Sequence, residues 1–222
     1  MAKRTGQEVM VFNPLTSHPS IKMDDLSVNL NKGWAYQTLA NCIEYDKEYW
    51  EKYIKYENIP ICKPLNDFRS DLATKYCNNI IDIGIGSGAF LKSLNIEKKG
   101  FDVNKHAIEW LQDNNLYHDP YDNENNFDGF CFWDVLEHFE NPNEILCKVS
   151  KNSYVITSLP IFNDITKVHL SKHYRPNEHL CYFTINGIIN FFDELKFECI
   201  EIRSDEIKIG RQDIMAFVFR KV

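Results

Sequence analysis

Residues 80–90 constrain the fold of this chain more than any other part of its sequence. A short β-branched run ends at Asp82, and glycine then occupies every second position, at Gly84, Gly86 and Gly88. The apolar stretch that follows is typical of a helix beginning directly after the turn. A strand, a glycine-rich turn and a helix start form the nucleotide-binding corner of doubly wound α/β sheets. We therefore expect a parallel sheet whose first strand ends in a cofactor-binding loop.

Alternating strand and helix patterns continue to the end of the chain. Strands are expected at 79–83, 99–103, 129–133 and 154–158, and helices at 89–94, 105–114, 143–149 and 184–195. The polar segment 115–126 leaves room for only a very short third strand, and strands at 197–203 and 214–220 close the chain. This pattern predicts an α/β fold: a Rossmann-like, seven-stranded, mostly parallel sheet with a C-terminal antiparallel hairpin and helices on both faces.

The N-terminal part is expected to form a mostly helical extension. Residues 1–30 have weak periodicity, and we interpret them as irregular or partly strand-like. Aromatic residues recur at helical spacing through 35–56, and a second helix is expected at 67–77. The first helix is either a lid over a substrate or an ordinary packed helix, with Trp34 and Tyr36 expected near the pocket. We predict one domain, with residues 1–77 as a cap and 78–222 as the core.

Composition limits the classes of partner and compartment. The 222 residues carry a formal charge of −7, which gives no general attraction for nucleic acid. The seven cysteines form no C-x-x-C pair, so neither a metal site nor a disulfide framework is predicted, and a reducing compartment is favoured. No apolar run is long enough to span a bilayer. We expect a cytoplasmic monomer or homodimer that contacts no membrane.

Acidic residues at the strand ends favour one cofactor over another. S-adenosylmethionine carries an ammonium, a sulfonium and a ribose diol but no phosphate, so it requires carboxylates where a dinucleotide requires N–H donors. Asp82 precedes the glycine loop, and Asp102 ends the next strand, where a carboxylate can accept from both ribose hydroxyls. The spacing Gly84-x-Gly86-x-x-Ala89 also satisfies a relaxed dinucleotide fingerprint, so the loop alone does not decide between them.

A third motif carries a family resemblance. The apolar run 129–133 leads into Asp134-x-Leu136-Glu137-His138, and Asn-Pro follows at 141–142. Together with the motifs around Asp82 and Asp102, this resembles class I S-adenosylmethionine-dependent methyltransferases of the small-molecule type, over roughly residues 78–222. The resemblance implies S-adenosyl-L-methionine as cofactor, with Asp134 beside its methionine end. The candidates for contact with the adenine are two acids and two tyrosines, Asp119, Asp122, Tyr117 and Tyr121.

A second resemblance points to a base. The sequence Glu178-His179-x-x-Tyr182-Phe-Thr is similar to a signature of ketosugar C-methyltransferases. The similarity implies His179 as the base, Glu178 as its helper and Tyr174 as a polar partner. Those enzymes also carry a cysteine-rich zinc domain, and no such pattern occurs in these 222 residues. The alternative is that His179 and Tyr182 cap and pack the following helix.

Two further charged side chains have two interpretations each. His138 is either part of the chemistry or an anchor for the cofactor loop. Arg175 either grips an anionic substrate group or pairs with a nearby acid on the surface.

The sequence therefore predicts methyl transfer to a small molecule, with a sugar or sugar nucleotide as the candidate acceptor. The alternatives are a nucleic-acid-modifying methyltransferase and a non-catalytic cofactor-binding module. The acidic charge disfavours the former, as does the absence of a Pro-Cys nucleophile and of an Asn/Asp-Pro-Pro-Tyr/Phe motif after the strand at 129–133.

Overall fold

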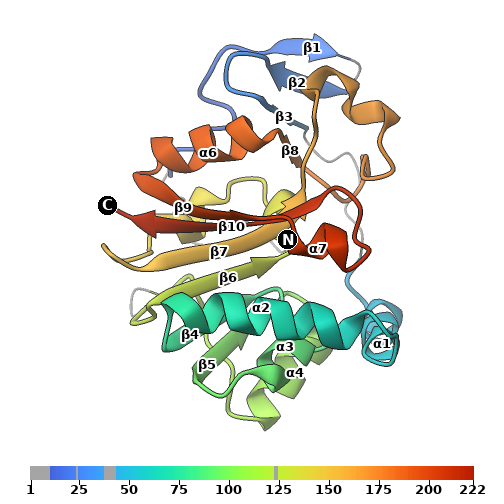
Figure 1. Cartoon of the computed structure of the whole chain (residues 1–222), viewed down its shortest axis with the longest axis vertical. Helices are drawn as coiled ribbons and strands as arrows, with labels where there is room; N and C mark the ends of the chain where they lie inside the picture. The colour runs from blue at the N-terminus through green and yellow to red at the C-terminus, as the bar shows by residue number, and fades with distance from the viewer. Residues whose placement is uncertain (1–10, 24, 38–43, 123–124) are drawn as a thin grey trace.

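The structure, a computed structural model, describes residues 11–23, 25–37, 44–122 and 125–222 (Figure 1). A six-stranded sheet crosses the molecule in the order β5-β4-β6-β7-β10-β9. Its strands are β4 (Asn79–Ile83), β5 (Glu97–Phe101), β6 (Gly129–Trp133), β7 (Tyr154–Pro160), β9 (Phe197–Arg203) and β10 (Ile214–Lys221). Only β10 runs antiparallel to its neighbours, so the other strands end at one edge. The predicted α/β fold and closing antiparallel pair are confirmed.

The expected seventh strand is reduced to a single bridge within the described residues. Gly100 on β5 forms one isolated parallel bridge with Tyr117, and the sheet has six strands rather than seven. The physical reason lies in the segment 115–126, where Pro120 and several Asn and Asp residues offer little apolar side-chain area for a strand.

Helices cover both faces of the sheet because its strands alternate apolar side chains between two cores. Ile80, Cys131 and Ile156 face the core under α2 (Cys62–Tyr76), α3 (Ala89–Ser93) and α4 (Lys105–Asp113). Ile81 and Phe130 face the core under α5 (Asn143–Leu146) and α6 (Ile185–Glu194). Side-chain caps begin two of these helices: Asn104 accepts from the His106 amide, and Thr184 from the Gly187 amide.

Strands in the described N-terminal residues match the partly strand-like interpretation of 1–30, but the strand at 34–36 differs from the helix expected from residue 35. β1 (Ile21–Met23), β2 (Leu26–Asn29) and β3 (Trp34–Tyr36) join β8 (Cys181–Phe183) in a second sheet, at the top of Figure 1. The helix expected over 35–56 is α1 (Lys47–Tyr56), which Asp46 caps, and residues 38–43 lie outside the described residues. The expected placement of Trp34 near the pocket is wrong: its side chain is buried against Phe191.

Three short elements complete the fold. They are the 3-10 turns η1 (Leu136–His138) and η2 (Ile165–Leu170), and the helix α7 (Asp205–Lys208) in the connection between β9 and β10. Helices α1 and α7 lie at the edge where β6 and β7 end, at the right of Figure 1. Among the described residues, no helix is both long and apolar enough to cross a membrane.

Candidate active site

The glycine loop forms a backbone cradle between β4 and α3. Gly84, Gly86 and Gly88 have φ values of 76°, 54° and 77°, a region that glycine adopts without the cost that a Cβ imposes. The chain also approaches its neighbours closely here, since a Cβ on Gly84 would lie 2.5 Å from the side chain of Val135. Gly84 and Gly86 line the cavity described below, whereas Gly88 packs against Trp110.

Asp82 lies at the end of β4, directly below this loop. Its side chain is buried, and its Oδ1 has no hydrogen-bond partner among the described residues. Burial raises the pKa of Asp82 well above its ordinary value, although the charge of Arg69 acts in the opposite direction. A buried acceptor oxygen ordinarily receives a hydrogen bond, and none of the described residues donates one to Asp82 Oδ1.

Asp102 follows the end of β5 and meets the same loop. Burial raises its pKa to about 6, while hydrogen bonds from the backbone amides of Asn104 and Gly86 oppose the shift. The Asn104 amide donates to Oδ1 over 2.8 Å. Asp102 is therefore a carboxyl group fixed in place beside the cradle.

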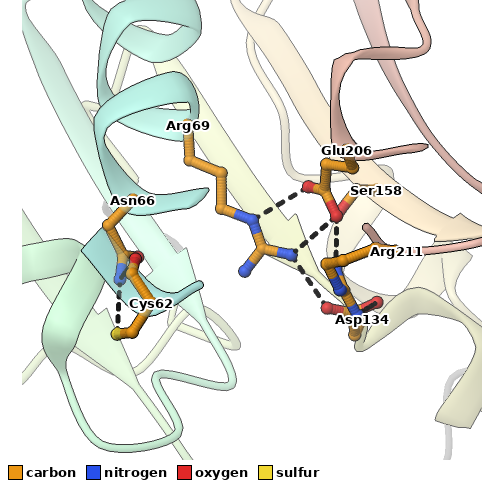
Figure 2. A network of polar contacts seen from close by, with 7 residues as sticks. All are labelled: Cys62, Asn66, Arg69, Asp134, Ser158, Glu206 and Arg211. Atoms are coloured by element: carbon orange, nitrogen blue, oxygen red, sulfur yellow. Dashed lines mark hydrogen bonds and ion pairs between the residues drawn. The ribbon is translucent and has the colours of Figure 1, made fainter. Parts of the chain in front are cut away.

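Asp134 follows β6 and is held by two arginines (Figure 2). Arg69 Nη2 donates to Oδ2 and Arg211 Nη2 to Oδ1, each over 2.9 Å. Burial acts to raise the pKa of Asp134, but the two guanidinium charges outweigh it and hold the pKa below its usual value. Asp134 therefore stays ionised, and both of its oxygens are engaged within the protein.

Glu206 on α7 completes this network. Arg69 Nε donates to Glu206 Oε1 over 3.0 Å, and Arg211 Nη1 donates to Oε2. Arg69 Nη2 also reaches the hydroxyl of Ser158 on β7, over 3.1 Å (Figure 2). The Glu206 side chain is fully buried, so its charge depends on these two cations. Two positive and two negative groups thus join α2, the ends of β6 and β7, and α7.

Sequence reasoning missed Arg69, Glu206 and Arg211. Arg69 precedes Asp134 by 65 positions and Glu206 by 137, so no local spacing connects them. A lone arginine on an amphipathic helix is ordinarily a surface residue. The available signal was the position of Arg69 among the apolar residues of its helix, beside Leu72 and Ala73, which are also buried.

A polar wall faces this network from η1 and the segment before β8. Glu137 and His179 are buried, and the rings of His138 and His179 lie 4.9 Å apart at 83°. Burial lowers the pKa of His138, and it lowers the pKa of His179 to about 3. Both rings are therefore neutral near pH 7.

The other residues predicted for catalysis are placed differently. Glu178 pairs with Arg175 over 3.0 Å, while its backbone carbonyl meets His138 Nδ1. The hydroxyl of Tyr174 donates to Asp25 over 2.6 Å, and Tyr174 does not line the cavity described below. The predicted trio is therefore not one hydrogen-bonded unit.

Tyrosines of α1 and the residues before it form the opposite wall. The rings of Tyr45 and Tyr49 meet edge to face with centroids 4.9 Å apart, and those of Tyr49 and Tyr53 are tilted by 42° with centroids 5.0 Å apart. A Cβ on Gly86 would lie 3.1 Å from the Tyr53 ring. Burial raises the pKa of both Tyr49 and Tyr53, so their hydroxyls stay protonated. Of the two alternatives for this helix, its position against the loop fits a lid.

The residues predicted to contact adenine lie behind the pocket rather than in it. Tyr117 and Tyr121 pack against the ring of Phe101, at centroid distances of 6.3 and 5.8 Å. Phe101 and Val103 line the cavity, whereas Asp119 and Asp122 do not.

These walls enclose one cavity of about 500 Å³, within the range of small-molecule sites. Asp82, Asp102 and Asp134 all line it, together with the glycine loop, the tyrosines of α1, and the polar wall of Glu137, His138 and His179. The orphaned Asp82 oxygen and the Cβ-free loop fit a ligand with ammonium and hydroxyl donors that approaches the backbone closely.

A family model described as a methyltransferase domain matches residues 49–202, more than half of the chain. The chain belongs to the methyltransferase domain family. S-adenosyl-L-methionine is its cofactor, and the donor set around the loop fits that molecule. No curated protein matches the sequence.

Solved structures of methyltransferases share the fold. An S-adenosylmethionine-dependent methyltransferase from Thermotoga maritima is 14% identical with a TM-score of 0.57, and the match covers 79% of this chain and 97% of that one. One from Archaeoglobus fulgidus is 18% identical with a TM-score of 0.53, covering 78% and 100%. Magnesium protoporphyrin IX methyltransferase from Synechocystis, with bound S-adenosylhomocysteine, is 11% identical with a TM-score of 0.52, covering 79% and 94%.

Proposed function

We propose that this methyltransferase acts on a small-molecule acceptor bound in the cavity, between the cofactor loop and the histidine wall. The observation that carries the proposal is that one hollow of about 500 Å³ is lined by both the glycine loop and the Glu137, His138 and His179 wall. A cavity of this size that also holds the cofactor accommodates a metabolite rather than a segment of a folded macromolecule.

The lining favours a polar acceptor, and a sugar or sugar nucleotide is the candidate we carry forward. Tyr49 and Tyr53 offer protonated hydroxyls beside flat apolar rings, a combination that suits a polyol. Arg175 lines the cavity and is half exposed, so it can meet a phosphate or carboxylate at the rim. The net charge of −7 disfavours nucleic acid.

In the proposed reaction the chain's own residues provide alignment. S-adenosylmethionine supplies a methyl group on a sulfonium, whose transfer is an in-line displacement. Asp82 and Asp102 orient the cofactor from the loop side, and the charged network around Asp134 lies at its methionine end. The acceptor approaches from the polar wall.

His179 remains the candidate base. It is neutral, as a proton acceptor must be, but its pKa of about 3 makes it a weak one for a hydroxyl acceptor.

The test is incubation of the protein with S-adenosylmethionine labelled in the methyl group and separate pools of nucleotide sugars, other hydroxylated metabolites, tRNA and DNA. We expect labelled product in a metabolite pool, identified by mass spectrometry, and none in the nucleic acids. Label transferred only to nucleic acid would overturn the proposal. His179→Gln tests the candidate base in the same assay. His169→Gln is its control, because His169 is exposed and does not line the cavity.

A further inference from the structure

Three side chains with metal-binding donors converge on the cavity wall. Glu137, His138 and His179 each offer one donor atom, and these atoms all lie within 4.8 Å of one another. Glu137 and His138 come from η1, directly after β6, and His179 comes from the segment before β8. Two separate motifs therefore place one carboxylate and two imidazoles next to one another.

The backbone holds these two segments together. The Leu180 amide donates to the Glu137 carbonyl over 2.6 Å, one residue after His179. His138 Nδ1 lies 2.9 Å from the Glu178 carbonyl, one residue before it. His179 is thus flanked on both sides by hydrogen bonds to η1, and the relative positions of the three donors are set by the main chain.

One of the two imidazoles has a ring nitrogen directed at a backbone carbonyl. A carbonyl can only accept, so His138 donates from Nδ1 to Glu178, and the lone pair of the neutral ring lies on Nε2. This is the arrangement that orients metal-binding histidines in proteins, with one nitrogen fixed by a backbone acceptor and the other left for the ion.

Glu137 provides an independent observation that points to a ligand. Its side chain is 2% exposed, and Oε2 has no hydrogen-bond partner among the described residues. Among the described residues, no arginine or lysine forms an ion pair with Glu137, whereas Glu206 pairs with both Arg69 and Arg211. A buried carboxylate oxygen without a partner is costly unless a cation or a proton satisfies it.

We propose that Glu137, His138 and His179 bind one divalent transition-metal ion, whose remaining coordination positions face the cavity. In the proposed function, a hydroxyl or carbonyl oxygen of the acceptor fills these open positions. This part of the inference alone rests on the proposed function. Two imidazoles and a carboxylate form the ligand set of catalytic zinc sites, whereas Mg²⁺ and Ca²⁺ prefer oxygen ligands alone. An ion here would polarise the acceptor oxygen.

Geometry and charge both allow the ion. Donors about 2.1 Å from a tetrahedral ion lie about 3.4 Å apart, so modest rotations of these side chains close the shell. The nearby cations do not leave an excess of positive charge at the site. Arg175 is paired with Glu178, and Arg211 is paired with Asp134 and Glu206.

The test is isothermal titration of the tag-free, chelator-treated protein with zinc chloride, and in parallel with magnesium chloride. We expect one zinc ion per chain and much weaker binding of magnesium. Glu137→Gln and His179→Asn should each weaken zinc binding at least ~100-fold, with unfolding temperatures near that of the wild type. His169→Ala and Cys147→Ser, which change an exposed histidine and an exposed thiol, should bind zinc as the wild type does.

Absence of zinc binding in the wild type, equal binding in Glu137→Gln and His179→Asn, or loss of binding in Cys147→Ser would each overturn the site. Methyl transfer that survives chelation unchanged would overturn the metal role in the reaction while leaving the proposed function intact. Stoichiometric zinc binding with no methylated metabolite would instead support the site and refute the proposed function.

Discussion

Arg69→Met tests whether the charged network under the cavity holds the site together. Arg69 is buried on α2 and its guanidinium contacts Asp134, Ser158 and Glu206, so one side chain connects three other parts of the fold. Methionine retains a long apolar side chain that can pack against Trp133, over which the guanidinium now lies at 4.9 Å. The substitution therefore removes the charge and its hydrogen bonds with limited change in packing.

The expected cost follows from what the change leaves behind. Glu206 has no exposed side-chain area, and among the described residues Arg211 is the one ion-pair partner left to both Glu206 and Asp134. Removing one member of a buried ion pair costs about 3–5 kcal/mol. Because Arg211 still contacts both carboxylates, we expect the lower end, about 3 kcal/mol. For a domain of this size that corresponds to a fall in Tm of roughly 6–12 °C.

The assay is equilibrium unfolding in urea, followed by circular dichroism and by tryptophan fluorescence. Lys63→Met is a matched control on the same helix: Lys63 pairs with Asp67, its side chain is 83% exposed, and its loss should change the free energy of unfolding by less than about 0.5 kcal/mol. Arg69→Met combined with Glu206→Gln should recover part of the loss, because Arg211 then faces one buried carboxylate instead of two. A cost below about 1 kcal/mol, or strictly additive effects in the double variant, would refute the ionic account.

Three more predictions concern the glycine loop, Asp102 and the start of a helix. Gly84→Ala should destabilise the protein by about 2–4 kcal/mol in urea unfolding, because the new Cβ meets Val135 at 2.5 Å. At Gly210 a Cβ would only make an ordinary van der Waals contact with Ile61, at 3.8 Å, so Gly210→Ala should cost about 1 kcal/mol from backbone strain. Affinity for S-adenosylhomocysteine should fall up to roughly tenfold from pH 7 to pH 5, because the bound state needs the Asp102 carboxylate, whose pKa is about 6. Calorimetric titration that shows no pH dependence in the wild type, or an equal fall in Asp102→Asn, would contradict this. Thr184→Ala should lower the free energy of unfolding by about 1 kcal/mol through loss of the α6 cap, and a change below about 0.3 kcal/mol would show that the cap is dispensable.

The core of the fold was predictable because its signals are local. The strands β4, β6, β7 and β10 are short, mostly apolar runs, and the glycines at 84, 86 and 88 have the positive φ values that glycine adopts readily. The second sheet was not predictable in this way. β3 is three residues long, and its partner β8 pairs Ala35 with Tyr182, so the stabilising contacts lie far apart in sequence.

The candidate site was predictable to a similar extent. Asp82 and Asp102 could be placed because parallel strands end at one edge of the sheet, whatever lies between them. The partners of Asp134 could not, since Arg69 and Arg211 come from helices and loops whose packing sets their direction. The sequence also placed Glu137 beside His138, but only the fold brings His179 next to them.

The measurement that tests the central claim most directly is calorimetric titration of the protein with S-adenosylhomocysteine, and separately with NAD. The claim is that Asp82, Asp102 and the glycine loop bind an adenosyl sulfonium cofactor. It predicts one binding site per chain for S-adenosylhomocysteine, none for NAD, and an affinity that falls by about 1–3 kcal/mol, or about 5- to 150-fold, in Asp102→Ala. Binding of NAD instead, or an affinity for S-adenosylhomocysteine that Asp102→Ala leaves unchanged, would contradict the account.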